Sequence, residues 1–303
     1  MKKHSIASSI ALGGALLLGL AACSPPSTGG GSSGEALENG DQDVLELAVF
    51  QGWDEGIAAS WLWKSVLEDE GYTVNLRPAT LAPVFVGLTG GDYDVVLDTW
   101  LPTTHAAEIE EYGDDLVDLG AWNEDAKLAI AVNEDAPIDS IEELEANADL
   151  FGGRIVGIES GAGLTSAVQD AVIPEYGITG LELQTSSTPA MLTELQTATE
   201  NGEDIAVTLW SPHWAYDAYP VKDLADPLGT LGDAESIHSF GGPTFTEDFP
   251  QLAEWLQAFT MDTATLASLE NAMFNSGVDG SDYTEVVNTW IDDNQEYVDG
   301  LTS

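Results

Sequence analysis

Three tryptophans, Trp53, Trp100 and Trp210, each stand just past a short apolar run that is typical of a β-strand. These runs cover residues 44–50, 93–98 and 205–209. Side chains beyond the strand ends of an open α/β sheet face its ligand crevice, so we expect the three indoles to converge there. Several indole faces around one point attract a cation that cannot donate hydrogen bonds, such as a quaternary ammonium. The spacing therefore predicts an aromatic box for a small organic cation.

The elements that must position these rings alternate between strand and helix along the chain. Apolar runs predict strands at 44–50, 72–76, 93–98, 126–132, 154–158, 181–185 and 205–209. Helical spacing predicts helices at 56–70, 83–88, 164–175 and 189–201, another beginning at 138, and a mostly helical tail from 249 onward. The run at 126–132 is apolar throughout, which favours a central strand. The alternation predicts an α/β protein with parallel sheets flanked by helices, in two lobes.

The start of the chain carries targeting signals. Lys2 and Lys3 precede an apolar stretch at 6–20, which is typical of a signal-peptide core and too short for a stable membrane span. The stretch ends in Leu-Ala-Ala-Cys23, which resembles the lipobox of bacterial lipoproteins and implies cleavage before Cys23 and acylation of its thiol. Because Cys23 is the only cysteine, we expect neither a disulfide nor a cysteine-based zinc site.

A flexible tether is expected after this signal. Residues 24–43 are rich in Gly, Ser and Pro and then acidic, and such a segment lacks the apolar content of a core. We therefore predict a signal peptide at 1–22 and an acylated cysteine with its linker at 23–43. The exported body at 44–303 is long for one domain and suits two lobes.

The charge balance is strongly acidic. The chain has 53 Asp and Glu against 7 Lys and Arg, a formal net charge of −46. Such a surface repels nucleic acid and anionic lipid, so neither is an expected partner. We interpret the scattered carboxylates as a solvated, halophilic surface, because molar salt screens their repulsion within a few ångströms. The alternative, a surface that stores cations, lacks the residue spacing of a metal-binding loop.

Motifs of the common enzyme classes are missing from the sequence. There is no Gly-x-Ser-x-Gly elbow between a predicted strand and helix, no phosphate-binding Gly-x-x-x-x-Gly-Lys-Ser/Thr loop and no His-Glu-x-x-His. Beyond the signal segment, His105, His213 and His238 lack the context of a metal triad. A nucleophilic Ser160 would need His105 as its base, and nothing else supports that pair. We therefore expect no catalysis, no cofactor and no metal site.

A structural or adhesive lipoprotein is a third functional class, besides an enzyme and a solute receptor. Such a protein would not need aromatic residues at strand ends in both lobes.

Four motifs together indicate a family. They are Trp210-Ser-Pro-His-Trp214 and the segments 52–57, 100–105 and 157–163. With their mutual spacing, they resemble the substrate-binding proteins of glycine betaine/proline betaine/choline ABC transporters, over about 44–273. The resemblance implies a two-lobed periplasmic-binding-protein fold of type II, with parallel-rich sheets flanked by helices and a ligand cleft between the lobes. We expect lobe one at 44–131 plus 232–303 and lobe two at 132–231, with a hinge near Val132 and Leu228.

The same resemblance implies the ligand-binding residues. The aromatic box of the family maps onto the three strand-end tryptophans. The backbone amides of Gly163 and Leu164 correspond to the pair that holds a ligand carboxylate, and His105, five residues after a box tryptophan, corresponds to the histidine that also holds it. Amides at a helix N-terminus carry positive potential and attract a carboxylate, which is consistent with this role for Gly163 and Leu164.

Four further residues are weaker candidates. Glu55 lies where choline binders carry an acid for the ligand hydroxyl, although a solvated acid at a helix start would look the same. Trp122 lies near the place where some members add a fourth aromatic ring. His213 and Trp214 are expected to shape the wall and pack under Trp210 rather than to contact ligand.

The sequence thus predicts a receptor that is extracytoplasmic and anchored to the membrane as a lipoprotein. It would bind glycine betaine or a related quaternary-ammonium solute and deliver it to the permease and ATPase subunits of an ABC transporter, for osmoprotective uptake. A choline receptor of the same transporter class is the alternative. The sequence alone does not rank betaine, choline, carnitine and ectoine as ligands.

Overall fold

The computed structural model describes residues 42–275, 277 and 282–303. The predicted signal peptide, the acylation site Cys23 and nearly all of the predicted linker lie outside the described residues. None of the helices in the described ranges combines the length and the apolarity that crossing a bilayer requires.

The described residues form one nine-stranded sheet with the order β2-β1-β3-β9-β4-β7-β5-β6, and β8 pairs with β4 off this path. The strands are β1 (Val44–Phe50), β2 (Thr73–Ala79), β3 (Val95–Leu101), β4 (Val117–Asn133), β5 (Arg154–Val156), β6 (Glu182–Gln184), β7 (Ala206–Ser211), β8 (Val221–Asp223) and β9 (Glu235–Gly241).

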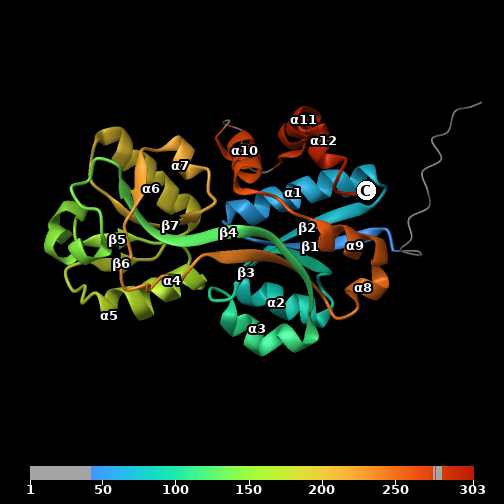
Figure 1. Cartoon of the computed structure of the whole chain (residues 1–303), viewed down its shortest axis with the longest axis horizontal. Helices are drawn as coiled ribbons and strands as arrows, with labels where there is room; N and C mark the ends of the chain where they lie inside the picture. The colour runs from blue at the N-terminus through green and yellow to red at the C-terminus, as the bar shows by residue number, and fades with distance from the viewer. Residues whose placement is uncertain (1–41, 276, 278–281) are drawn as a thin grey trace, which may run out of the picture. The chain divides into compact units, whose positions relative to one another are not determined.

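Helices surround both ends of this sheet (Figure 1). Beside β1, β2 and β3 lie α1 (Asp54–Asp69), α2 (Leu81–Gly90), α3 (Ala106–Tyr112), α8 (Phe245–Asp248), α9 (Pro250–Ala258), α10 (Thr263–Phe274), α11 (Thr284–Asp293) and α12 (Gln295–Val298). Beside β5, β6 and β7 lie α4 (Gly163–Ala167), α5 (Ile173–Glu175), α6 (Thr188–Asn201) and α7 (Ala215–Ala218). A π-helical turn, Val168–Val172, makes α4 and α5 nearly continuous.

The long strand β4 joins the two ends of the sheet. Its first part pairs with β9 as far as Ala126, and from Lys127 onward it pairs with β7. The sequence predicted only its second part, because Gly120 and the polar run Asn123–Asp125 interrupt the apolar alternation of the first part. The lobe boundary at 131/132 and the hinge positions stay predictions.

The sheet is mixed rather than parallel-rich. Among the strands of the described residues, β1 pairs parallel with β2 and β3, and β5 pairs parallel with β6 and β7. Strand β4 pairs antiparallel with each of its neighbours, and β9, which the sequence did not predict as a strand, lies antiparallel between β3 and β4. In β9 every second residue from Glu235 is buried, but polar residues occupy two of those positions, so the apolar alternation that marks a strand was weak.

The helix expected from 138 is replaced by two short 3-10 helices, Ile141–Glu143 and Glu145–Phe151. Ser140 caps the first one in a capping box with Glu143. The backbone of Asn147 departs from helical geometry with φ of −118°, which interrupts any longer helix.

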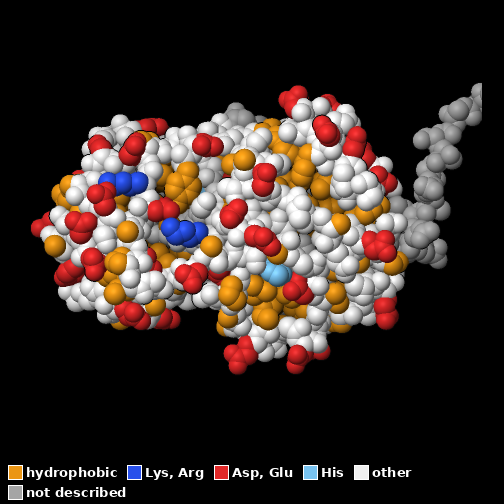
Figure 2. All heavy atoms as spheres, in the orientation of Figure 1, with side chains coloured by type: hydrophobic (Ala, Val, Ile, Leu, Met, Phe, Trp, Pro, Cys, Tyr) orange, Lys and Arg blue, Asp and Glu red, His pale blue; other side chains and the backbone are white. Residues whose placement is uncertain are grey.

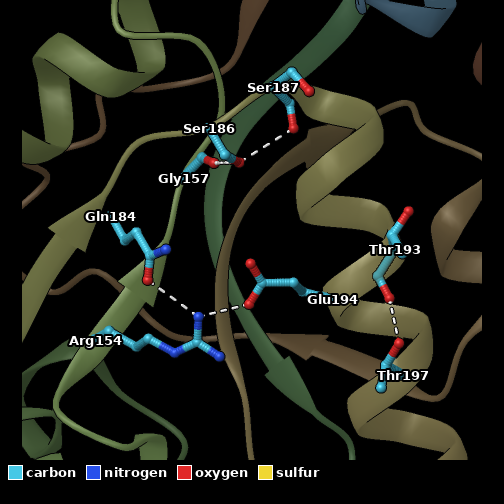
Figure 3. Close-up of polar contacts among 8 residues, drawn as sticks. All are labelled: Arg154, Gly157, Gln184, Ser186, Ser187, Thr193, Glu194 and Thr197. Atoms are coloured by element: carbon cyan, nitrogen blue, oxygen red, sulfur yellow. Dashed lines mark hydrogen bonds and ion pairs between the residues drawn. The ribbon is translucent and has the colours of Figure 1, made fainter.

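A polar contact ties β5, β6 and α6 together (Figure 3). The guanidinium of Arg154 on β5 donates to Glu194 Oε2 on α6 at 2.6 Å and to Gln184 Oε1 on β6 at 3.1 Å. Nearby, Ser186 Oγ donates to the carbonyl of Gly157 at 2.8 Å. The bonds of Arg154 hold the start of β5, and the bond of Ser186 holds the first residue of the loop that leads from β5 to α4.

The surface is acidic and its cations are paired. Figure 2 shows carboxylates spread over the displayed face with few basic groups among them. Lys2 and Lys3 lie outside the described residues, and the other five Lys and Arg each pair with a carboxylate. These ion pairs are Lys64–Glu68, Arg77–Glu46, Lys127–Asp223, Arg154–Glu194 and Lys222–Asp139. Most carboxylates of the described residues therefore have no Lys or Arg partner, in keeping with the net charge of −46.

Candidate functional site

A pocket lies beside β4, where β1, β3, β5 and β7 bring their ends or following loops together. The residues that line the pocket are Trp53, Glu55, Trp100, Thr104, His105, Leu128, Ile158, Ala162, Gly163, Leu164 and Trp210. The structure thus brings together all six residues that the sequence singled out first, along with the weaker candidate Glu55.

The three tryptophans reach the pocket from different elements. Trp53 is the N-cap of α1, directly after a turn in which Gly52 has φ of +87°. Trp100 and Trp210 lie within β3 and β7, which extend three and two residues beyond the predicted strand ends. Their exposed fractions are 8%, 3% and 3%. The indoles are therefore almost fully withdrawn from water, the condition under which cation–π attraction is strongest.

His105 presents one free hydrogen-bond donor in this pocket. Its Nδ1 accepts a hydrogen bond from the backbone N–H of Trp100 at 2.8 Å, so the ring proton resides on Nε2. Nε2 is buried and has no partner among the described residues. Burial lowers the pKa of His105 to about 3, so the imidazole is neutral at physiological pH. The ring also stacks on Trp53, with centroids 5.3 Å apart and planes 15° apart.

Two hydrogen bonds from backbone amides hold the loop that carries His105. The buried carboxylate of Glu235, on β9, accepts from the N–H groups of Thr103 at 2.7 Å and Thr104 at 2.8 Å. Because one carboxylate accepts both amides, the loop between β3 and α3 has a defined position. The sequence did not single out Glu235, which is 131 residues away from Thr104 in the chain.

Gly163 and Leu164 are the first residues of α4. Amide groups in the first turn of a helix have no acceptor within the helix and can bind an anion. A Cβ atom at position 163 would lie 2.5 Å from the carbonyl oxygen of Thr104. Glycine is therefore required here by the close approach of the β3–α3 loop to α4.

Buried carboxylates accept hydrogen bonds from three indoles. Trp210 Nε1 donates to Glu55 Oε2 at 2.8 Å, Trp100 Nε1 donates to Asp98 Oδ1 at 2.9 Å, and Trp214 Nε1 donates to Asp54 Oδ2 at 2.6 Å. These bonds orient the rings.

The three acceptors and Glu270 of α10 form a buried group of acids, and we call these four residues the carboxyl cluster. Burial is the main cause that raises the pKa of each member, to about 7 for Asp54. Repulsion from neighbouring carboxylates raises each pKa further.

Sequence reasoning missed Asp54, Asp98 and Glu270 as part of the site. For Asp98 a signal existed, because a residue two positions before Trp100 on a strand points to the same face. Glu270 offered no such signal, because it comes from a helix far along the chain.

The remaining weak candidates lie outside the pocket. Trp122 is buried in the core, where its Nε1 donates to the carbonyl of Leu97 at 2.5 Å and its ring stacks on Phe259. The expectation of a fourth box ring at Trp122 is therefore corrected: its position on β4 directs it away from the pocket into the core.

His213 packs against Trp210, and Trp214 packs against His213. The ring of His213 meets Trp210 edge-on at 4.6 Å and stacks on Trp214 at 5.8 Å. His238 lies on β9 and interacts with Asp118 at 3.0 Å, away from the pocket. In the described part of the chain, no group of His, Cys, Asp and Glu side chains has an arrangement that could hold a metal ion.

Comparison with known proteins finds similarity to substrate-binding proteins of transport systems. The sequence pattern of OpuAC, the substrate-binding domain of ABC-type glycine betaine transport systems, matches residues 43–293. The glycine betaine/carnitine transport binding protein GbuC of Listeria monocytogenes is 34% identical over 165 residues, which cover 54% of this chain and 52% of GbuC. The chain thus matches about half the length of that relative. Over 115 residues, 36% of this chain, it is 32% identical to an uncharacterized protein, ORF1, of Chromohalobacter salexigens.

Solved structures of substrate-binding proteins have folds similar to that of this chain. Lactococcal OpuAC in its closed conformation with glycine betaine has a TM-score of 0.78 and 28% identity, covering 86% of this chain and 100% of that one. The ProX protein of Borrelia burgdorferi has a TM-score of 0.77 and 27% identity, covering 84% of this chain and 95% of that one. A choline-binding protein in complex with choline has a TM-score of 0.77, but at 22% identity the likeness concerns the fold alone. The predicted type II periplasmic-binding-protein fold is confirmed.

Proposed function

The chain belongs to the family of substrate-binding domains of ABC-type glycine betaine transport systems, and on that premise we propose that it is an extracytoplasmic receptor for glycine betaine or a related quaternary-ammonium solute. It would deliver this solute to the permease and ATPase subunits of an ABC transporter, for osmoprotective uptake. We propose no catalytic activity, because members of this family bind solutes for transport.

One observation carries the proposal: three buried indoles and an unpaired histidine donor line the same pocket. The trimethylammonium group of glycine betaine would lie among Trp53, Trp100 and Trp210. It makes no hydrogen bonds with water, and each well-placed ring contributes about 2 kcal/mol or more once the site is desolvated.

The ligand carboxylate would face the opposite groups of the pocket. His105 Nε2–H would donate one hydrogen bond to it, and the amides of Gly163 and Leu164 would donate two more. Since His105 is neutral, the charge that assists these bonds comes from the ligand carboxylate alone.

Calorimetric titration at molar salt tests the proposal. We expect glycine betaine to bind, and each of Trp53→Ala, Trp100→Ala and Trp210→Ala to weaken binding about tenfold or more, which corresponds to about 1.4 kcal/mol. Trp255→Ala on α9, outside the pocket, is the matched control. Wild-type affinity in two of the three box variants, with circular dichroism unchanged, would contradict the assignment.

A choline receptor is the second candidate, and the position of Glu55 favours it. This buried carboxyl lines the pocket and could accept a hydrogen bond from the choline hydroxyl. Choline lacks the carboxylate that His105 and the α4 amides would bind, so we expect the same titration to rank glycine betaine first. The reverse order would establish the choline reading.

Delivery of the solute would use the rest of the chain as well. We propose that Cys23 anchors the receptor in the membrane and that the linker lets it reach the permease. We further propose that the two lobes, 44–131 plus 232–303 and 132–231, close on the ligand as rigid bodies about the hinge near Val132 and Leu228.

A further inference from the structure

The indoles of the pocket are held by acids that have no basic partner. Trp210 donates to Glu55 and Trp100 donates to Asp98, and the exposed fraction of each acid is 2%. Asp98 packs directly against the first turn of α1, because a Cβ atom at Gly56 would lie 2.3 Å from Asp98 Oδ2. That oxygen has no hydrogen-bond partner in the described part of the chain.

The charged groups that act on the pKa of these two acids are themselves acids. Asp54 on the same turn of α1 raises the pKa of Glu55, and Glu270 on α10 raises that of Asp98. Beyond them, Glu159 acts on Asp54 and Asp217 acts on Glu270 in the same sense. Burial and this mutual repulsion raise the pKa of Glu55 to about 8 and that of Asp98 well above its usual range, so both acids keep their protons at neutral pH while no cation is near.

No cation of the described residues stabilises the ionised form of these acids. All five Lys and Arg in the described ranges pair with other carboxylates. His213 Nε2 lies 3.7 Å from Asp54 Oδ2, but burial lowers the pKa of His213 to about 3 and leaves it neutral. His105 is neutral for the same reason, and no group that could hold a metal ion was found in these ranges. A buried charge without a partner is costly, so these acids ionise only when a cation from outside enters the pocket and supplies that partner.

We propose that Glu55 and Asp98 supply the counter-charge for the cation of the ligand, acting through the indoles of Trp210 and Trp100. They are specificity-determining positioning residues, and this role rests on the proposed function. The indole N–H donates to a carboxylate, which makes the ring face more negative and hence more attractive to a cation. Because water is excluded from the pocket, the attraction between carboxylate and ammonium is also weakly screened.

The proposed counter-charge leads to a prediction about which ligands bind. The pocket should select a permanently charged ammonium over an uncharged group of the same shape. Glycine betaine and 3,3-dimethylbutanoate form a suitable pair, because a carbon atom replaces the nitrogen and the carboxylate is the same. If the acids only oriented the indole rings, the difference in affinity between these two ligands would be smaller.

Isosteric neutral variants separate charge from orientation. In Glu55→Gln and Asp98→Asn the amide oxygen still accepts the indole N–H, while the negative charge is removed. We expect each variant to bind glycine betaine about tenfold more weakly and to bind 3,3-dimethylbutanoate with little change. The indole N–H signals of Trp210 and Trp100 in proton–nitrogen-15 NMR correlation spectra should keep their wild-type positions, because both rings keep their hydrogen bonds.

The control variant is Glu145→Gln. This exposed carboxylate accepts hydrogen bonds from the amides of Thr179 and Gly180, far from the pocket, and its loss changes the net charge by the same amount. It should leave both affinities unchanged.

Two results overturn the inference. One is that Glu55→Gln and Asp98→Asn keep the wild-type preference for the charged ligand. The other is that they weaken both ligands equally while the indole signals shift, which would indicate orientation alone. If the wild-type chain binds neither glycine betaine nor choline, the proposed function itself fails, and this outcome is distinct because it appears before any variant is made.

Discussion

At the scale of single residues, burial decides the chemical state of the groups in the pocket. His105 accepts the N–H of Trp100 through Nδ1 and is neutral because burial lowers its pKa. The pocket therefore offers a carboxylate a neutral donor rather than a second ion. The same burial raises the pKa of the acids behind the rings.

The neutral donor of His105 leads to a prediction about ligand preference. His105→Ala removes the Nε2–H donor, and a hydrogen bond to a charged group is worth about 1.5–3 kcal/mol. We expect glycine betaine to bind about tenfold more weakly or worse, while choline, which lacks the carboxylate, changes far less. Calorimetry with both ligands measures the gap between them. An equal loss for both ligands would show that His105 acts only as packing against Trp53.

The buried acid Glu270 leads to a prediction about stability. Its side chain is fully buried (0% exposed) and its pKa is raised well above 4.5, mainly by burial. Above pH 4.5 the unfolded chain is ionised at this position while the folded chain keeps the proton. The free energy of unfolding then falls by about 1.4 kcal/mol per pH unit up to the folded-state pKa.

Glu270→Gln removes this slope, so the variant should gain stability relative to the wild type as the pH rises from 5 to 8. Urea denaturation at constant molar salt measures the difference. Glu254→Gln, an exposed acid on α9, is the control and should follow the wild-type profile. A constant difference between Glu270→Gln and the wild type across this pH range would contradict the burial argument.

At the scale of elements, the pocket depends on how closely loops approach each other. The β3–α3 loop is held by Glu235 and reaches the first turn of α4. Glycines permit this approach where a side chain would collide. Gly163 is one case, and Gly52, where a Cβ atom would lie 2.9 Å from Glu159 Oε1, is another.

Gly163→Ala tests the close approach of α4 and the β3–α3 loop. The new methyl group would lie 2.5 Å from the carbonyl oxygen of Thr104. We expect glycine betaine affinity to fall about tenfold or more, because the two segments must separate by enough to lose hydrogen bonds to the ligand. Gly161→Ala in the same loop is the matched control, since no atom lies within 4 Å of its Cβ position. Unchanged affinity in Gly163→Ala would show that the loops are not packed this closely when ligand binds.

At the scale of the whole molecule, the charge of −46 determines how stability responds to salt. The five Lys and Arg of the described ranges are already paired, so the remaining carboxylates repel one another. Salt shortens the range of this repulsion to about 3 Å at 1 M. A receptor for a compatible solute would also work at high external salt, which agrees with the same composition.

The thermal midpoint should therefore rise steeply between low and molar NaCl, because screening relieves the repulsion in the folded state. Differential scanning calorimetry across this range measures the rise. Sucrose at matched water activity is the control, because it stabilises without screening charge. A midpoint that is flat in NaCl, or that rises equally in sucrose, would contradict the electrostatic explanation.

The sequence by itself determined the local features of this protein. Strands such as 44–50 and the helix of α6 follow from apolar runs and helical spacing, which act between near neighbours in the chain. Trp53, Trp100 and Trp210 could be chosen because their place at strand ends and their surrounding motifs are local as well. The pocket lining, which also includes His105 and Gly163, agrees with that choice.

Only the tertiary structure decided which groups lie behind the rings and in what state. Glu55 meets Trp210 across 155 positions of sequence, and Glu270 joins the cluster from α10. Likewise, β9 became a strand because β3 and β4 flank it, and Trp122 went to the core because β4 carries it there. Desolvation and hydrogen-bond partnership arise from contacts between distant segments, and no local pattern of residue types encodes those contacts.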